Sequence, residues 1–184
     1  MTAPGRPALA VPRISRAPRD DKEQAAANAR ITALLSRPDP GPVATHLALV
    51  HFTGRRSGRP YTVPAGVHRL DGALYLATSS PWRHNFTPAA DGELTWQGRR
   101  TPARFRLVTD PGLTARGYLE LWQRYDRESG PRRLGITVAD GPEPTLDDFR
   151  AAVAGIPLTL VAVTLKTADT ADTAELAVNE RTSR

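Results

Sequence analysis

Short segments typical of β-strands follow one another along residues 47–107, and brief turns separate them. Apolar and polar side chains alternate through residues 61–69, which is the period of an extended chain with one buried face. The Asp71-Gly72 pair, typical of a tight hairpin turn, leads into the near-continuous apolar residues 73–77. No helical segments alternate with these strands, as they would in βαβ units of a parallel sheet. The pattern therefore predicts an antiparallel meander, with strands expected at residues 47–53, 61–69, 73–78, 93–97 and 103–107.

A further strand is expected at the strongly apolar residues 157–165, after a helical excursion. Added to the meander, this strand could close the sheet into a small barrel, which removes exposed strand edges. Pro64 has no N–H to donate to a neighbouring strand, so it predicts an edge or a bulge. The predicted fold class is α+β: a barrel of about six mainly antiparallel strands with flanking helices.

Three helices are expected around this barrel. The first should begin near Asp20, because acidic residues suit the positive end of the helix dipole. The second should begin with Asp110 as N-cap and Pro111 in the first turn. The third should begin at Thr145, with Asp148 completing a capping box.

The distribution of prolines and apolar residues predicts one domain with two tails. Residues 1–19 carry several prolines and no apolar period, so we expect them to be disordered. The barrel domain should span residues 20–166, and residues 167–184 should form a polar, mostly disordered tail. Residues 129–144 are expected to be loop.

The charge and the missing cysteines restrict the kinds of function. The 25 Lys and Arg residues outnumber the 19 Asp and Glu residues, giving a formal net charge of +6. This excess favours anionic partners such as phosphorylated cofactors, nucleic acid or acidic lipids. The chain has no cysteine, which excludes disulfides and thiolate chemistry. We expect no transmembrane segment and a cytoplasmic location, because no apolar stretch could span a bilayer and the N-terminus lacks a signal-peptide pattern.

The loop between the first two strands is the leading candidate for a binding site. It reads Thr53-Gly54-Arg55-Arg56-Ser57-Gly58-Arg59-Pro60. Its glycines allow a ligand to approach the backbone, and its N–H groups and guanidinium groups can bind phosphate or carboxylate. One hypothesis is that the loop grips an anionic cofactor tail, and the alternative is a solvated surface hairpin.

A second candidate site lies in the long connection at residues 79–92, since long ordered loops are often functional. Trp82 could pack beside a flat ring while His84 or Asn85 bonds the polar edge of that ring. The alternative is a structural turn in which Trp82 closes the end of the barrel.

Aromatic residues of the second helix admit two interpretations. Tyr118, Trp122 and Tyr125 share one face of that helix and are typical of a buried core. The functional alternative is that Tyr118 or Tyr125 lines a substrate pocket.

Arginines and histidines elsewhere suggest little further chemistry. Arg99, Arg100, Arg104 and Arg106 could form a basic stripe, but they also fit the solvent face of an outer strand. Nucleic acid is not expected as a partner, because aromatic residues make up only 6% of the chain. The four histidines show no metal-binding spacing, so no metal site is expected.

Taken in order, these motifs resemble the deazaflavin-dependent nitroreductase family, within the FMN-binding split β-barrel superfamily. The resemblance covers residues 47–108, with a weaker echo at 156–165. The family pattern is an apolar strand, a T-G-R-[KR]-[ST]-G-x-P loop, a T-x-P strand, a D-G turn, a second apolar strand and W-x-x-N. The corresponding residues here are 53–60, 62–64, Asp71-Gly72, 73–77, and Trp82 with Asn85.

The resemblance implies binding of coenzyme F420, a deazaflavin with a phosphate and an oligoglutamate tail. In this chain Arg55, Arg56, Ser57 and Gly58 correspond to the family's phosphate-binding turn, and Arg59 adds charge beside it. Pro64 corresponds to the backbone that borders the deazaflavin ring, and Ser79 to the strand end that meets the cofactor. Tyr61 departs from the pattern, since the family commonly has a basic residue there.

The activity implied is hydride transfer from reduced F420 to a small electron-poor acceptor such as a quinone, a nitro compound or an unsaturated compound. The proton donor is left open between a pocket tyrosine, His84 and solvent. FMN binding and a non-catalytic cofactor-binding role are the alternatives, and the split-barrel resemblance also implies a homodimer.

Overall fold

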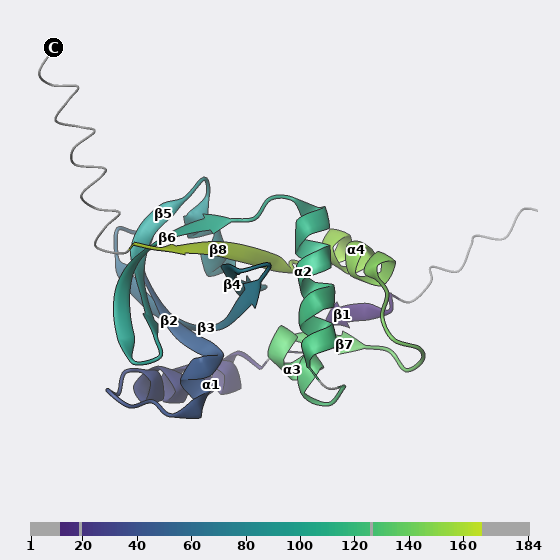
Figure 1. The fold of residues 1–184 in the computed structure, drawn as a ribbon, viewed down its shortest axis with the longest axis horizontal. Helices are drawn as coiled ribbons and strands as arrows, with labels where there is room; N and C mark the ends of the chain where they lie inside the picture. Colours follow the sequence, from purple (N-terminus) through teal and green to yellow (C-terminus); the bar gives the residue numbers. More distant parts are fainter. Residues whose placement is uncertain (1–11, 19, 126, 167–184) are drawn as a thin grey trace, which may run out of the picture.

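The computed structural model describes residues 12–18, 20–125 and 127–166 of the chain. Strands close into an antiparallel barrel with the neighbour order β2-β3-β4-β8-β6-β5, and helices flank it (Figure 1). The strands are β2 (Leu47–Thr53), β3 (Pro60–Leu70), β4 (Ala73–Thr78), β5 (Ala90–Trp96), β6 (Arg99–Leu107) and β8 (Thr159–Leu165). The predicted α+β split barrel with flanking helices is confirmed.

The strand order differs from the predicted continuous meander. β2, β3 and β4 follow one another, but β8 lies between β4 and β6, and β5 pairs with β2. β4 and β5 are therefore consecutive along the chain but do not pair with each other in the barrel. The connection between them carries the short 3-10 helix η2 (Pro81–Phe86).

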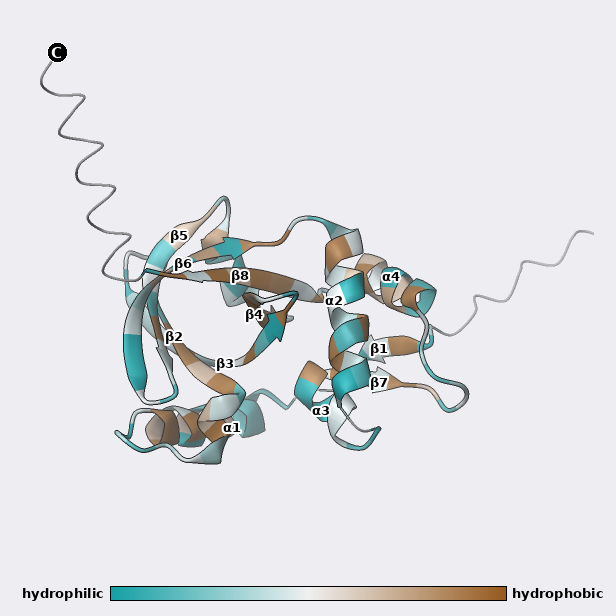
Figure 2. Ribbon diagram, viewed as in Figure 1, coloured by the Kyte–Doolittle hydropathy of each residue, from teal (hydrophilic) through white to brown (hydrophobic). Residues whose placement is uncertain are grey.

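The interior of the barrel is apolar and is closed at one end by η2. Figure 2 shows hydrophobic residues along β2 and β8, among strands that also carry hydrophilic positions. Phe86 of η2 is fully buried, with its ring centroid 5.0 Å from that of Phe105 and 5.2 Å from that of Phe52. Trp82 packs at this end too, 5.8 Å from Phe86. This agrees with the structural interpretation of Trp82 as part of the barrel closure.

Pro64 lies where one edge of β3 is unpaired. It is opposite Leu49 of β2, but the pairing of β3 with β4 begins only at Gly66. No ladder hydrogen bond is lost when the residue at an unpaired edge lacks an N–H. The predicted edge position of Pro64 is confirmed.

Helices begin at the predicted caps. They are α1 (Asp21–Leu35), α2 (Pro111–Arg124) and α4 (Leu146–Gly155). The Asp20 carboxylate accepts from the backbone of the first turn of α1, and Asp110 does the same for α2. Thr145 and Asp148 form the predicted capping box of α4. These caps satisfy N–H groups that a helix cannot bond internally.

Helices α2 and α4 form a layer against the outside of the barrel. α2 approaches the barrel closely at Gly117, where a Cβ would lie 2.7 Å from Leu160 Cδ1 and 3.1 Å from Leu70 Cδ1. Tyr118 and Phe149 are fully buried within this layer. The molecule therefore has two main apolar cores. One lies inside the barrel, and the other, which we call the helical core, lies between the barrel and these helices.

Two sequence predictions about irregular regions are wrong. β1 (Ile14–Arg16), within the tail predicted to be disordered, pairs antiparallel with β7 (Ile136–Val138). The predicted loop at residues 129–144 contains β7 and the helix α3 (Ser129–Leu134). Both strands are too short to show a period in the sequence. They are stabilised because Ile14 and Ile136 are buried in the helical core.

Other predictions about the tails fall on residues 1–11 and 167–184, which lie outside the described residues. Within the described part of the chain, every helix is too short or too polar to cross a membrane.

Candidate functional site

The arginine loop after β2 is folded by its own backbone. The Gly54 N–H donates to the Arg59 carbonyl at 2.8 Å, and the Gly58 N–H donates to the Gly54 carbonyl at 2.8 Å. Gly58 has φ +64°, a conformation that residues with a Cβ seldom adopt. The loop is thereby a compact turn with its arginines exposed.

Helix η2 holds the loop through Asn85. The Asn85 Oδ1 atom accepts from the Arg55 N–H at 2.8 Å, and its Nδ2 donates to the Trp82 carbonyl at 2.8 Å. Arg55 also donates from Nη1 to the Thr87 carbonyl at 2.8 Å. Asn85, predicted to bond a ligand edge, therefore uses both side-chain polar atoms to attach the loop to η2, and Arg55 takes part in the same attachment.

The loop borders a cleft of about 670 Å³, which we call the loop cleft. It is lined by Phe52, Gly54, Arg55, Arg56, Ser57, Tyr61, Val63, Pro81, Trp82, His84 and Asn85. Tyr61 is 43% exposed and stacks on Phe52, with ring centroids 5.5 Å apart and planes 21° apart. The loop cleft therefore combines a rim of arginine with aromatic faces. Arg59 and Gly58, which the sequence placed in this site, do not line it.

A second cleft, of about 610 Å³, lies over the outer face of β3 and β4, and we call it the strand cleft. Its lining comes from residues 16–18, 63–66, 77–80 and 132–135, with Trp82 and three side chains of α1. Pro64 and Ser79, both predicted from the sequence, are among these residues. The structure therefore brings these two residues to the same cleft.

The two clefts adjoin, because Val63 and Trp82 line both. The loop cleft contributes Arg56, and the strand cleft contributes residues of β3 and β4.

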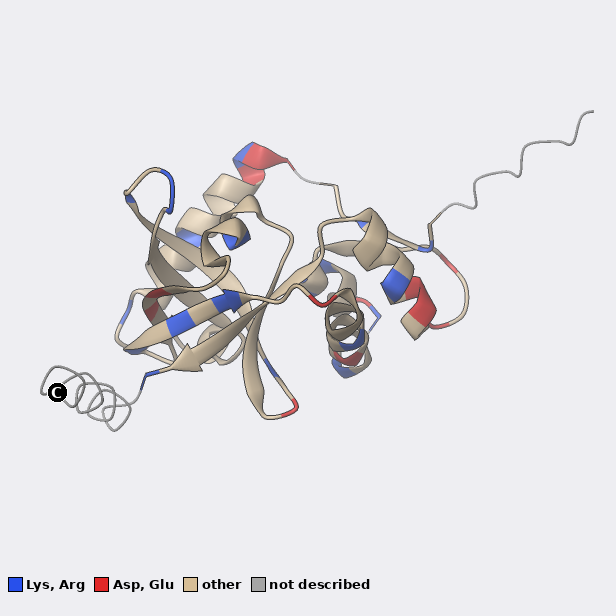
Figure 3. Ribbon diagram, turned by 90° about the horizontal axis from the view of Figure 1, so that it is seen from above, with Lys and Arg blue, Asp and Glu red and all other residues tan. Residues whose placement is uncertain are grey.

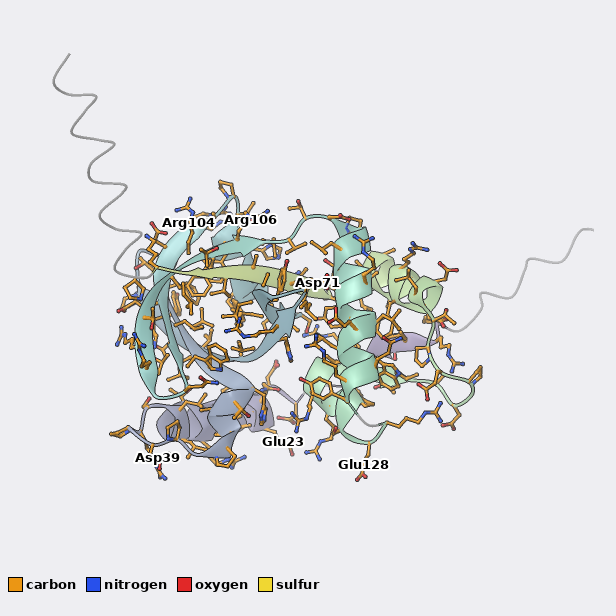
Figure 4. The ribbon with its side chains drawn as sticks, in the orientation of Figure 1. Glu23, Asp39, Asp71, Arg104, Arg106 and Glu128 are labelled. Carbon is orange, nitrogen blue, oxygen red and sulfur yellow. The ribbon has the colours of Figure 1, made fainter. Side chains whose placement is uncertain are left out.

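Cations predominate in the strand cleft. Arg16, Arg132 and Arg133 line it, and Glu23 is the acidic residue among its lining side chains. Glu23 lies on the part of α1 turned toward α3 (Figure 4). Lys and Arg residues are spread over both the barrel and the helical side of the molecule (Figure 3). The strand cleft therefore favours a ligand with negative charge or electron-rich oxygens.

Arg83 of η2 binds the backbone of two residues that line the strand cleft. Its Nη1 atom donates to the carbonyls of Ser79 and Ser80, each at 2.9 Å. Burial lowers the pKa of Arg83 from its usual value, but an arginine remains charged. Arg83 therefore fixes the segment that joins the two clefts.

His84 lines the loop cleft as predicted and is largely exposed. Partial burial lowers its pKa, and the neighbouring Arg83 and Arg55 lower it further. His84 is therefore predominantly neutral at neutral pH, and its ring can both donate and accept a hydrogen bond.

The predicted pocket role of Tyr118 is wrong, because the residue is fully buried in the helical core. Its hydroxyl donates to the Thr159 carbonyl at 3.3 Å, and burial raises its pKa. Tyr125 lines neither cleft. Its hydroxyl lies 3.0 Å from Nδ1 of the buried His68.

Sequence reasoning missed Gly66 and the arginines of the strand cleft. Arg16 and Arg132 lie in segments that were expected to be irregular. It also gave no sign that His68, on a strand with alternating side chains, would be buried. His68 is 7% exposed, and burial lowers its pKa to about 4, with Arg124, His46 and Arg133 adding to the effect.

The arginine stripe on β6 is an ordinary solvent face. Arg104 and Arg106 project from the outside of the barrel (Figure 4). Arg104 pairs with Asp91 at 3.1 Å, and Arg100 donates from Nε to Glu93 at 3.0 Å. These pairs reduce the charge available to an anionic polymer. Within the described ranges, no group of three or more His, Asp or Glu side chains is placed to hold a metal ion.

Comparisons with known proteins add solved structures of low similarity. No protein-family model matches the chain, and no curated protein matches it. A proposed 5-nitroimidazole antibiotic resistance protein from Bacteroides thetaiotaomicron is 13% identical, with 84% of this chain and 85% of that chain covered and a TM-score of 0.35. An F420 reductase is 16% identical, with 73% and 92% covered and a TM-score of 0.32.

A third solved structure is an FAD and heme binding protein from Mycobacterium smegmatis. It is 17% identical, with 84% of each chain covered and a TM-score of 0.29. At such scores the likenesses bear no weight in assigning a function, which must be argued from the clefts themselves.

Proposed function

We propose that this protein is an F420-dependent oxidoreductase that passes a hydride from the reduced deazaflavin to a small electron-poor acceptor. The observation that carries the proposal is the continuity of the loop cleft with the strand cleft at Val63 and Trp82. The loop cleft offers groups that can bind an anion, and the strand cleft offers residues of β3 and β4 on which a planar ring could lie. These are the requirements of a ligand with a phosphate at one end and a planar ring at the other.

The loop has unused capacity for an anion. Arg56 lines the loop cleft and forms no ion pair with another described residue. The backbone N–H groups of Arg56 and Ser57 also have no acceptor among the described residues. A guanidinium group beside free N–H groups suits a phosphate, because charge-assisted hydrogen bonds are the strongest of their kind.

In such an enzyme the cofactor and the protein residues have separate roles. The bound cofactor supplies the hydride chemistry. The chain's own residues position the ring on β3 and β4, attach the anionic tail at the loop and shield one ring face with Trp82. His84 and solvent are the candidates for supplying the proton.

FMN is the alternative ligand, because it shares the planar ring and the phosphate. A non-catalytic cofactor-binding protein would use the same residues without an acceptor subsite. The homodimer and the cytoplasmic location expected from the sequence stay predictions. Light scattering of the purified protein tests the first.

Fluorescence titration with F420 and, separately, with FMN tests the proposal. We expect Arg56→Ala to weaken F420 binding by about tenfold to a hundredfold, the range for losing a charge-assisted contact. Arg59→Ala is the matched control, since it removes the same charge from the same loop at a position that does not line the cleft. Its effect should stay within about threefold.

Reduction of an acceptor panel by F420H2 then tests turnover. Binding of FMN alone would transfer the proposal to flavin chemistry. If neither ligand binds the wild-type protein at micromolar concentrations, the proposed function is wrong.

A further inference from the structure

His68 is a buried polar group with one nitrogen unused. The side chain lies on the outer face of β3 and is 7% exposed. Its Nδ1 lies 3.0 Å from the Tyr125 hydroxyl, whereas its Nε2 is buried without a hydrogen-bond partner among the described residues. An unsatisfied buried nitrogen costs free energy, so its persistence calls for an explanation.

Gly66 lies between this nitrogen and the strand cleft. Gly66 lines the cleft floor between Pro64 and His68 on the same face of β3. A Cβ placed on Gly66 would lie 3.0 Å from His68 Nε2, closer than to any other atom. Nε2 therefore lies just beneath the cleft floor, beside the one residue type that places no Cβ against it.

The partner of His68 sets which nitrogen carries the hydrogen. A phenol hydroxyl is a good donor and an imidazole nitrogen a good acceptor, so we assign Tyr125 as the donor to Nδ1, which puts the hydrogen of the neutral ring on Nε2. Arg133 lies over the Tyr125 ring, 5.0 Å from its centroid, and with Arg16 and Arg132 makes the surroundings positive. In these positive surroundings, the acceptor that best suits the Nε2–H group is an oxygen with partial negative charge.

We propose that His68 Nε2 donates a hydrogen bond, past Gly66, to a carbonyl oxygen on the pyrimidine ring of a flavin or deazaflavin lying on the strand-cleft floor. The inference rests on the proposed function and adds an orientation to it. The ring occupies the strand cleft with its carbonyl edge over Gly66, and the phosphate occupies the loop cleft.

Lumiflavin separates the two ends, because it has the ring and lacks the phosphate. We expect His68→Phe to weaken lumiflavin, FMN and F420 by the same factor, about tenfold, since all three present the same carbonyl edge. Gly66→Ala, which covers Nε2, should reproduce this effect. Arg56→Ala should weaken FMN and F420 but leave lumiflavin unchanged.

Gly155→Ala is the control for the glycine variant. It adds the same methyl group at a position on α4 with nothing within 4 Å of the new Cβ. Its lumiflavin affinity should equal that of the wild type.

Long-range ¹H–¹⁵N spectra of the imidazole side chains give a readout on the unaltered protein. The chain has four histidines, and the signal absent from His68→Phe identifies His68. We expect its free-state pattern to be that of the Nε2–H tautomer, and its Nε2 signal to shift on addition of lumiflavin.

Each failure has its own signature. If lumiflavin binds equally to the wild type and to His68→Phe, and the His68 signals do not move, the inference is wrong while the proposed function stands. If lumiflavin, FMN and F420 all fail to bind the wild type, the proposed function is wrong and the inference with it.

Discussion

The loop cleft and the strand cleft are neighbours that are built in opposite ways. The loop cleft comes from two short segments, 52–63 and 81–85, and its shape is fixed by hydrogen bonds among Gly54, Arg55 and Asn85. The strand cleft is assembled from β1, α1, β3, β4 and α3, which are widely separated along the chain. Local bonding shapes the first, and tertiary packing shapes the second.

Because the two clefts are built differently, a substitution in one should leave the other unchanged. A change within the loop should affect one cleft and little else. A change in the helical core should displace the walls of the strand cleft while the loop keeps its conformation. The four predictions below use this contrast.

The largest effect is expected from Phe86→Ala, which should disrupt both clefts at once. Phe86 is fully buried and contacts the rings of Phe52 and Trp82, and Trp82 lines both clefts. Loss of a buried phenyl ring should lower the free energy of unfolding by about 3–5 kcal/mol. Urea denaturation followed by circular dichroism measures it. A loss below about 1 kcal/mol would contradict the packing described for the barrel end.

The next effect is a pH dependence that comes chiefly from His68, on the strand-cleft side, because its pKa shift is the large one among the histidines. Burial, with smaller contributions from Arg124, His46 and Arg133, lowers the pKa of His68 from 6.5 to about 4. The unfolded chain then binds more protons than the folded one between these values. Stability present above pH 6.5 should therefore fall as the pH drops toward 4, by about 3 kcal/mol in all.

His68→Phe should flatten the pH dependence of stability in that range. Denaturation midpoints at several pH values, compared between the variant and the wild type, measure the difference. Equal slopes in both proteins would show that His68 is accessible to protons in the folded state.

Ile14→Ala tests whether the two clefts are independent, because it should disturb only the strand cleft. Ile14 is buried in the helical core, on the strand that carries Arg16 to the cleft wall. We expect a loss of about 2–4 kcal/mol in the free energy of unfolding. The loop cleft is formed by other segments, so the difference in affinity between FMN and lumiflavin should persist in the folded variant.

Asn85→Ala is the smallest change and the reciprocal test. It removes the acceptor for the Arg55 N–H and the donor to the Trp82 carbonyl. A stability loss of about 1–2 kcal/mol is expected. Binding of FMN should weaken while binding of lumiflavin is kept, as titration of both ligands would reveal. Equal weakening of the two would mean that the clefts are coupled through η2.

The contrast also explains what sequence reasoning could reach. The arginine loop is a continuous stretch with glycines at fixed positions, and its partner Trp82-to-Asn85 motif is equally local. Helix caps at Asp110 and Thr145 are likewise local signals, and the structure has both. The irregular tail and loop were misassigned because β1 and β7 have only three residues each, too few to show a period.

Local patterns specified the strands, the α+β class and the position of the arginine loop, because these features depend on neighbours along the chain. Folding added what no local pattern contains. It inserted β8 between β4 and β6, placed Tyr118 in a core, and brought Arg16 and Arg132 to one wall. It also placed His68 beside Gly66, with one ring nitrogen buried and without a hydrogen-bond partner among the described residues.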